Sequence, residues 1–161
     1  AAIDRVAPEA QAFAASLGIY GESDLLCYRA EGPETLARRQ AEAWDPVLEW
    51  AKTRFGIDFT LACGVMHRPQ PEATLERLRH ALAEKTPFEL AGLSPLVTIG
   101  GSLVLALALA EGAVDLDTAW AAATVDERYQ AEQWGEDSEA AAALDARRRD
   151  FAAGYRFLNL L

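Results

Sequence analysis

Residues 93–110 read LSPLVTIGGSLVLALALA and contain no charged side chain. A run of this length could span a membrane, but the central helix of a globular bundle is also apolar on every side. Glycines interrupt the run at Gly100 and Gly101, and its flanks carry the acidic residues Glu89 and Glu111 instead of the basic residues typical of membrane spans. We therefore predict a buried central helix, which the glycine pair lets a neighbouring helix approach closely.

The composition points to one helical domain around that centre. The chain has 161 residues, of which 51% are hydrophobic and 25% charged, a balance that excludes wholesale disorder. Alanine and leucine dominate while β-branched residues are sparse, which favours helix. We expect a mainly α fold, an orthogonal bundle of about six or seven helices with at most a short strand or extended segment. Because residue 1 already resembles a helix interior, residues 1–161 are expected to be a single domain of a longer protein.

Net charge and cysteine content limit which classes of partner and which cellular compartment are expected. The formal net charge is -10, so nucleic acid and anionic membrane surfaces are not expected partners. The basic run at residues 147–149 lies between aspartates and is interpreted as a solvated helix face. Cys27 and Cys63 are isolated and lack metal-ligand spacing, so we expect both to be reduced in a cytoplasm-like compartment, with no metal.

Helix boundaries follow from apolar periodicity, prolines and glycines. The segment Asp45-Pro46 either kinks one helix or caps the start of a new one. Residues 57–65 have strand-like composition and would need a partner strand elsewhere. Gly56, Gly112 and Gly135 are expected to end helices. The predicted helices cover residues 2–17, 33–55, 71–84, the segment from residue 87, 93–110, 115–134 and 138–158.

The segment that starts at Asp115 carries an unusual polar stripe. In a continuous helix, one face would combine a carboxylate and an amide with apolar side chains: Leu116, Trp120, Ala123, Glu127, Gln130 and Trp134. A carboxylate is rarely buried without a partner, so Glu127 is paired, near solvent or part of a recognition surface. Two readings stay open: Glu127 pairs with an arginine such as Arg29 or Arg128, or it docks a donor of a partner protein.

No catalytic constellation stands out, and we expect neither an enzyme nor a cofactor site. His67 and His80 match no catalytic pattern, and the glycine pair lacks the lysine and spacing of a phosphate loop. Two alternatives from other classes are kept. One is a small-molecule enzyme with Glu127 as acid or base and Arg29 as substrate anchor; the other is a membrane-associated regulator anchored by residues 93–110.

Several motifs together resemble one protein family. The first group is DLLCYRA at residues 24–30 with PETL at residues 33–36, Gln40 and WDP at residues 44–46. The second group is DERYQ at residues 126–130, followed by Trp134-Gly135. These resemble the signatures of the assembly chaperones that handle the α subunit of the F1 sector of ATP synthase in mitochondria and related bacteria.

The resemblance implies a function that spacing alone would not indicate. Members carry a largely β N-terminal region ahead of the helical domain, and that region is absent here. They bind the unassembled α subunit as non-enzymatic chaperones, which implies that Glu127, Gln130, Trp134, Arg29 and Asp126 contact the partner. A monomer is expected, in the bacterial cytoplasm or the mitochondrial matrix. The chain departs from the family pattern at Arg128, where an acidic residue is usual, and lacks a histidine that normally follows Trp134-Gly135.

Overall fold

The computed structural model describes the backbone of residues 2–135 and 137–161, and the side chains of residues 9–135 and 137–161. Within this part the chain forms eight α-helices, two short 3-10 turns and two very short strands. The mainly α prediction is confirmed, with slightly more helices than expected. In chain order the elements are α1 (Ala2–Gly18), η1 (Ile19–Gly21), η2 (Leu25–Cys27), β1 (Tyr28–Arg29), α2 (Glu34–Phe55), β2 (Ala62–Cys63), α3 (Glu72–Ala83), α4 (Pro87–Gly100), α5 (Leu103–Ala110), α6 (Leu116–Ala123), α7 (Val125–Trp134) and α8 (Ser138–Asn159).

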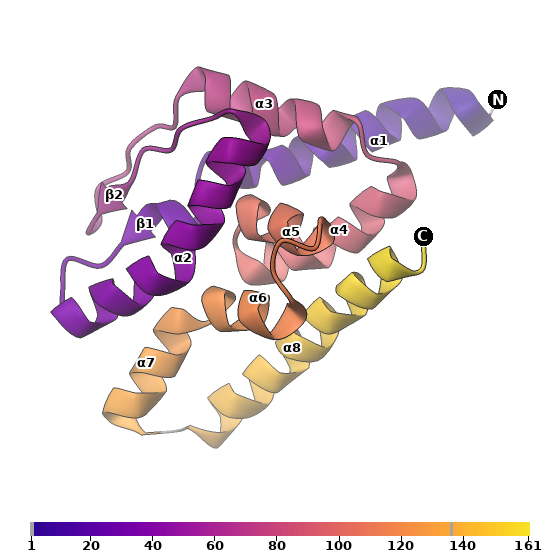
Figure 1. The fold of residues 1–161 in the computed structure, drawn as a ribbon. Coiled ribbons are helices and arrows are strands. Elements are labelled where there is room, and N and C mark those ends of the chain that lie inside the picture. The colour runs from indigo at the N-terminus through magenta and orange to yellow at the C-terminus, as the bar shows by residue number, and fades with distance from the viewer. Residues whose placement is uncertain (1, 136) are drawn as a thin grey trace.

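The helices pack around α5 at steep angles (Figure 1). Helices α1 and α3 lie side by side above it, and α2 covers a further side. Helix α8 crosses α4 below, whereas α7 projects away from the body of the domain. The strands β1 and β2 pair in parallel, with Tyr28 opposite Ala62 and Arg29 opposite Cys63. Only Ala62–Cys63 of the strand-like segment 57–65 is therefore a strand, and its partner is β1, in the segment between η2 and α2.

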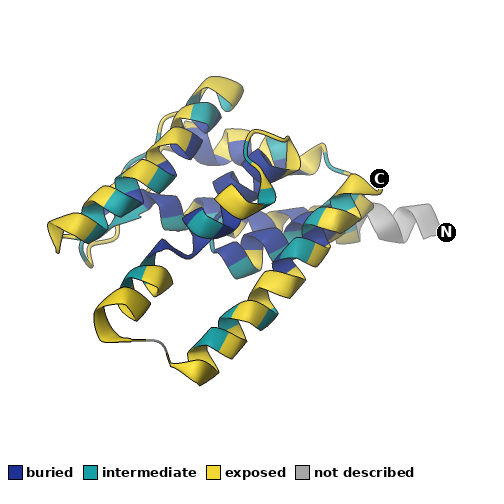
Figure 2. Cartoon of the chain, turned by 60° about the horizontal axis from the view of Figure 1, so that its bottom comes forward, coloured by how far each residue is buried: buried dark blue, intermediate teal, exposed yellow. Residues whose placement is uncertain are grey.

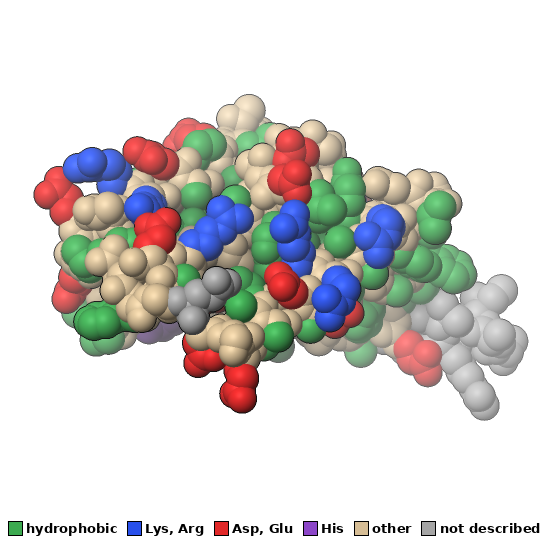
Figure 3. Space-filling view, turned by 90° about the horizontal axis from the view of Figure 1, so that it is seen from below, with side chains coloured by type: hydrophobic (Ala, Val, Ile, Leu, Met, Phe, Trp, Pro, Cys, Tyr) green, Lys and Arg blue, Asp and Glu red, His purple; other side chains and the backbone are tan. Residues whose placement is uncertain are grey.

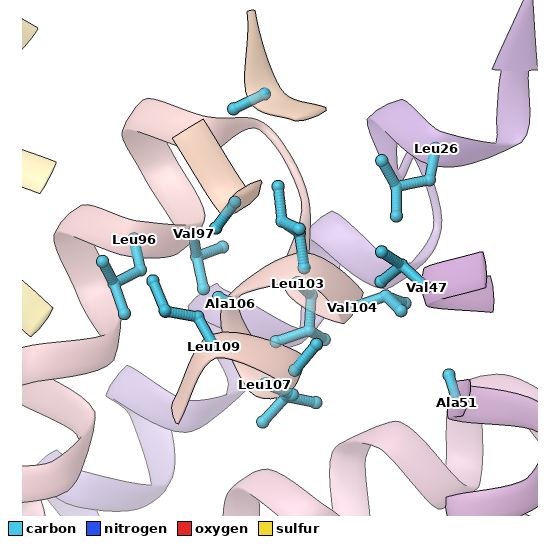
Figure 4. Packing of buried hydrophobic residues seen from close by; sticks show 14 of the residues in the cluster. Leu26, Val47, Ala51, Leu96, Val97, Leu103, Val104, Ala106, Leu107 and Leu109 are labelled. Carbon is cyan, nitrogen blue, oxygen red and sulfur yellow. The ribbon is translucent and has the colours of Figure 1, made fainter. Parts of the chain in front are cut away.

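The apolar stretch 93–110 is the centre of the core, as predicted, but it forms two helices. Helix α4 ends at Gly100, and Gly101 adopts a left-handed conformation with φ 73°. Ser102 is extended and caps α5, because its hydroxyl accepts a hydrogen bond from the backbone N–H of Leu105 at 3.0 Å. This break turns the chain, so that every residue from Leu103 to Leu109 is buried (Figure 4). In the described part of the chain, no helix is long and apolar enough to cross a membrane.

A buried carboxylate joins this break to the first sequence motif. Asp24 is 1% exposed and accepts hydrogen bonds from the Ser102 hydroxyl at 2.6 Å, the Val104 N–H at 3.0 Å and the Leu26 N–H at 3.1 Å. It therefore satisfies donors at the starts of both η2 and α5. Burial raises the pKa of Asp24 to about 6, although these hydrogen bonds lower it in part.

Glycines allow α4 and α8 to cross closely. A Cβ atom added to Gly154 would lie 2.5 Å from the Pro95 ring and 2.9 Å from the Gly92 carbonyl oxygen. A Cβ atom added to Gly100 would lie 3.3 Å from the Phe151 ring, so Gly100 contributes to the close approach, whereas Gly101 serves the turn after α4. The crossing therefore depends on the absence of side chains at these positions.

Other boundaries differ from the sequence prediction in detail. Helix α2 continues through Pro46, so the reading in which Asp45 caps a new helix is wrong and the reading of one helix holds. Asp137, not Ser138, caps α8, because its carboxylate accepts hydrogen bonds from the N–H groups of Glu139 and Ala140. Gly56 ends α2 in a left-handed conformation, as expected.

Replacing Gly154 by Ala tests the close crossing. On an exposed helix this substitution would stabilise by about 1 kcal/mol through helix propensity. Here the overlap with Pro95 predicts a lower free energy of unfolding, by about 1–3 kcal/mol, measured by denaturant titration. The neighbouring exposed Ala153→Ser variant is the control, and a G154A protein more stable than the wild type would contradict the crossing.

The pH dependence of stability tests the environment of Asp24. Its pKa rises from 3.8 to about 6 on folding, so the folded state holds the proton more tightly than the unfolded state. The contribution of this group is therefore complete below the unfolded pKa and is lost as pH rises through about 6. An Asp24→Asn protein lacks this titration, so the stability gap between wild type and variant should narrow by about 2 kcal/mol from pH 4 to pH 7. A gap that widens over this range would show that hydrogen bonding outweighs burial.

Candidate functional site

A helix break at Thr124 decides where the predicted polar stripe points. Thr124 is buried, with φ −120° and ψ 24°, and its hydroxyl donates to the carbonyl oxygen of Trp120 at 2.7 Å. The expected single helix is therefore divided into α6 and α7, and the continuous stripe of the sequence prediction is wrong. Trp120 lies in the core against Phe151, with ring centroids 5.3 Å apart, whereas Glu127 and Trp134 are exposed on α7.

The two sequence signatures meet where α7 is held against α2. The buried Gln40 accepts a hydrogen bond from the Ala30 N–H and donates one to the Asp126 carboxylate, both at 2.8 Å. The indole N–H of Trp44 donates to the carbonyl oxygen of Ala122 at 2.7 Å. The Gln40 bond orients the first turn of α7 and the Trp44 bond holds the end of α6. Residues of both motifs therefore connect α2 to these two helices.

Further along α7, an arginine of α2 continues this attachment. The Arg39 guanidinium lies 5.5 Å from the centre of the Tyr129 ring and forms an ion pair with Glu132. One face of α7 is thus attached to α2, while the remaining faces stay available.

An open groove lies between α7 and the first half of α8, and we call it the α7–α8 groove. Its volume is about 480 Å³, and its walls are rich in alanine. The two helices diverge from the body of the domain and are largely exposed there (Figure 2). The Trp134 side chain is 83% exposed at the end of α7, an unusual state for the largest apolar residue type. The groove is lined by Glu127, Gln130, Ala131, Trp134, Gly135, Asp137, Ala140, Ala141, Ala143, Leu144 and Arg147.

Three of the five predicted site residues line this groove: Glu127, Gln130 and Trp134. Among the described residues Glu127 forms no ion pair, so it pairs with neither of the arginines considered in the sequence analysis. Asp126 is half-buried and faces Gln40 instead of the groove. The partner contacts of all these residues remain predictions.

Arg29, the fifth predicted residue, lies elsewhere. Its guanidinium is 2.8 Å from the Asp45 carboxylate and 5.4 Å from the centre of the Trp44 ring, and its Nε donates to the Leu26 carbonyl oxygen at 3.0 Å. Its charge is therefore used to fix β1 against α2. The structure does not bring Arg29 together with Glu127 in one pocket.

A second hollow, which the sequence analysis missed, lies on another side of α7. We call this space between α2, α6 and α7 the α2–α7 hollow; its volume is about 490 Å³. Val125, Arg128 and Glu132 line it at a spacing of three and four residues, which is a helical face that could have been recognised in the sequence.

The chemistry of this region is that of a binding surface. Seen from below, basic and acidic side chains lie among apolar ones without a dominant patch of one sign (Figure 3). Among the described residues, no group of three His, Cys, Asp or Glu side chains could hold a metal ion. An exposed carboxylate, an amide and an indole in an open groove can recognise another protein through apolar contact and charge.

Comparison with known proteins identifies relatives of this chain. A family model described as "ATP12 chaperone protein" matches residues 1–52. The mitochondrial protein atp12 of Schizosaccharomyces pombe is 25% identical over 111 residues, which cover 64% of this chain and 38% of the yeast protein. The chain thus spans well under half the length of that relative.

Solved structures are similar over nearly all of the chain. The crystal structure of Atp12 from Paracoccus denitrificans is 45% identical with a TM-score of 0.92, over 99% of this chain and 68% of that one. The structure of the Atu1473 protein from Agrobacterium tumefaciens is 45% identical with a TM-score of 0.90, over 98% of this chain and 59% of that one. Nearly the whole fold of this chain therefore recurs as a part of these longer relatives.

Substitutions at the adjacent residues Asp126 and Glu127 test whether the first attaches α7 to α2 while the second only lines the groove. Asp126→Ala removes the acceptor of a partly buried hydrogen bond and should lower the free energy of unfolding by about 1–2 kcal/mol. Glu127→Ala, one position along, removes an exposed side chain and should change it by less than about 0.5 kcal/mol. Equal losses in the two variants, measured by urea titration, would show that Glu127 is also part of the framework.

Proposed function

The chain belongs to the ATP12 chaperone family, and from this premise we propose that it assists assembly of the F1 sector of ATP synthase by binding the unassembled α subunit. The observation that supports this proposal most directly is the α7–α8 groove, where Glu127, Gln130 and Trp134 are exposed around an alanine-rich wall. Through this groove the protein binds the surface of the α subunit that contacts β subunits after assembly. While it is bound, the subunit cannot aggregate through that surface.

The groove suits a temporary partner. An exposed indole supplies a large rigid contact, which is typical of the few residues that dominate binding energy at interfaces. The small alanine side chains beside it allow another backbone to approach closely, and Glu127 offers an acceptor for a basic or N–H donor group. An open groove with few strong contacts releases its partner when a β subunit with a larger complementary surface arrives.

The structure favours this function over the two alternatives. An enzyme that uses Glu127 would need a deep, closed pocket and a second functional group, but Glu127 is exposed and Arg29 is engaged with Asp45. A regulator anchored in the membrane by residues 93–110 would expose that stretch, but Leu103 to Leu109 are buried inside the domain.

We further propose that the protein acts as a monomer without a cofactor, in the cytoplasm of a bacterium or in the mitochondrial matrix. A 25% identical relative is described as mitochondrial, which supports the second compartment for a eukaryotic protein. The net charge of -10 helps to keep a complex with an aggregation-prone subunit in solution.

Replacing Glu127 by Lys in the intact protein tests the proposal. The wild type should suppress aggregation of isolated α subunit, measured by light scattering at equimolar concentration. The variant places a cation where the groove has an acceptor, so we expect at least about tenfold weaker binding. Because the side chain is exposed, the melting temperature should stay within a few degrees.

The matched control is Glu76→Lys, which makes the same charge change at an exposed position on α3, away from the groove. It should bind the α subunit as the wild type does. Absence of any suppression by the wild-type protein would refute α-subunit binding. Loss of folding in the Glu127 variant would instead assign that residue to the framework.

A further inference from the structure

The α2–α7 hollow has a floor of buried apolar side chains. Val47, Ala122 and Val125 are buried beneath it, and half-buried aliphatic residues of α2 and α6 surround them. The carbonyl oxygen of Ala122 accepts a hydrogen bond from the indole N–H of Trp44 at 2.7 Å. The floor therefore suits an apolar side chain and offers nothing to a polar one.

The rim of the same hollow carries charges of both signs. Arg39 and Glu132 pair with each other at one end. Arg128 on α7 and Glu42 on α2 are both exposed and line the hollow. Within the part of the chain that the structure describes, neither side chain has an ion-pair or hydrogen-bond partner. An apolar centre between an unpaired cation and an unpaired anion is the complement of a segment with the reverse arrangement.

Helical spacing places this hollow and the α7–α8 groove on different sides of one helix. Arg128 and Glu132 face the hollow, whereas Glu127, Gln130 and Trp134 face the groove. The adjacent residues Glu127 and Arg128 thus carry opposite charges and line different hollows. A partner that contacted only the groove would leave the hollow of about 490 Å³ unfilled.

We propose that the α2–α7 hollow is a second docking site for the same client polypeptide. The occupant is a client segment with an apolar side chain in the hollow, a carboxylate at Arg128 and a cation at Glu42. The client then holds α7 from two sides, and the two sites together bind more tightly than either alone. This inference rests on the proposed α-subunit binding. It gives a function to Arg128, which does not line the α7–α8 groove.

Charge reversal at the rim tests the inference with purified, unassembled α subunit as the probe. In the intact protein, Arg128→Glu and Glu42→Lys should each raise the dissociation constant at least about tenfold, because each brings like charges together. Arg38→Glu is the matched control: Arg38 is exposed on α2, pairs with Glu34 and does not line the hollow. It should leave the dissociation constant within about twofold.

The double variant R128E/E42K separates client recognition from a structural role. If the two residues only stabilised each other, exchanging their charges would restore binding. If they meet client charges, the double variant should bind as weakly as the weaker single variant or worse. Restored binding in the double variant would overturn the inference.

The outcomes also separate this inference from the function on which it rests. If E127K loses the α subunit while R128E and E42K keep it, the groove alone binds the client and the inference fails. If R128E abolishes self-association in sedimentation but leaves client binding unchanged, the hollow belongs to a second copy, and the inference fails again. If the wild type does not bind the α subunit, the proposed function fails as well.

Discussion

The arrangement of this domain depends on the buried carboxylate of Asp24. It satisfies donors at the starts of two elements that are far apart in the chain, η2 and α5, and so attaches the first sequence motif to the central helix. Without it, the N–H groups of Leu26 and Val104 would be buried without partners, and each such group costs about 1–3 kcal/mol. The position of η2 in turn fixes where β1 begins and where α2 can pack.

Polar contacts extend from this point to the candidate site. The Leu26 carbonyl accepts from Arg29, and the next residue, Ala30, donates to Gln40. Gln40 then donates to Asp126 in the first turn of α7. The projecting helix that carries the exposed groove residues is therefore oriented by a series of hydrogen bonds that starts in the core. Rigid support of this kind lets a binding surface stay exposed and still be well positioned.

The exposed surface of α7 and α8 has a cost for the domain. An indole that is 83% exposed, and alanines that face an open groove, contribute little burial to folding. The compact centre compensates, because glycines allow α4 and α8 to pack closely and the residues of α5 are almost wholly buried. The chain thus separates a part that supplies stability from a part that remains available for partners, a division common to proteins that bind transiently.

Local sequence patterns were sufficient to predict most helices of this protein. Gly56 and Gly135 mark helix ends because a residue without a Cβ atom adopts positive φ without strain, and the uncharged stretch 93–110 had to be buried because water disfavours it. The positions at which helices break could not be predicted from local sequence. Pro46 could have started a new helix and lies inside α2 instead, whereas Thr124, which gave no signal, separates α6 from α7 at a buried position.

The same contrast holds for the candidate site. Its residue types, Glu127, Gln130 and Trp134, were identified from one-dimensional spacing and from resemblance, and they do line one groove. Their direction was decided by the break at Thr124, and the use of Arg29 and Asp126 as framework residues by their proximity to Asp45 and Gln40. Spacing along the chain reports which side chains share a helix face. Only packing between distant segments determines whether that face meets the core, a neighbouring charge or solvent.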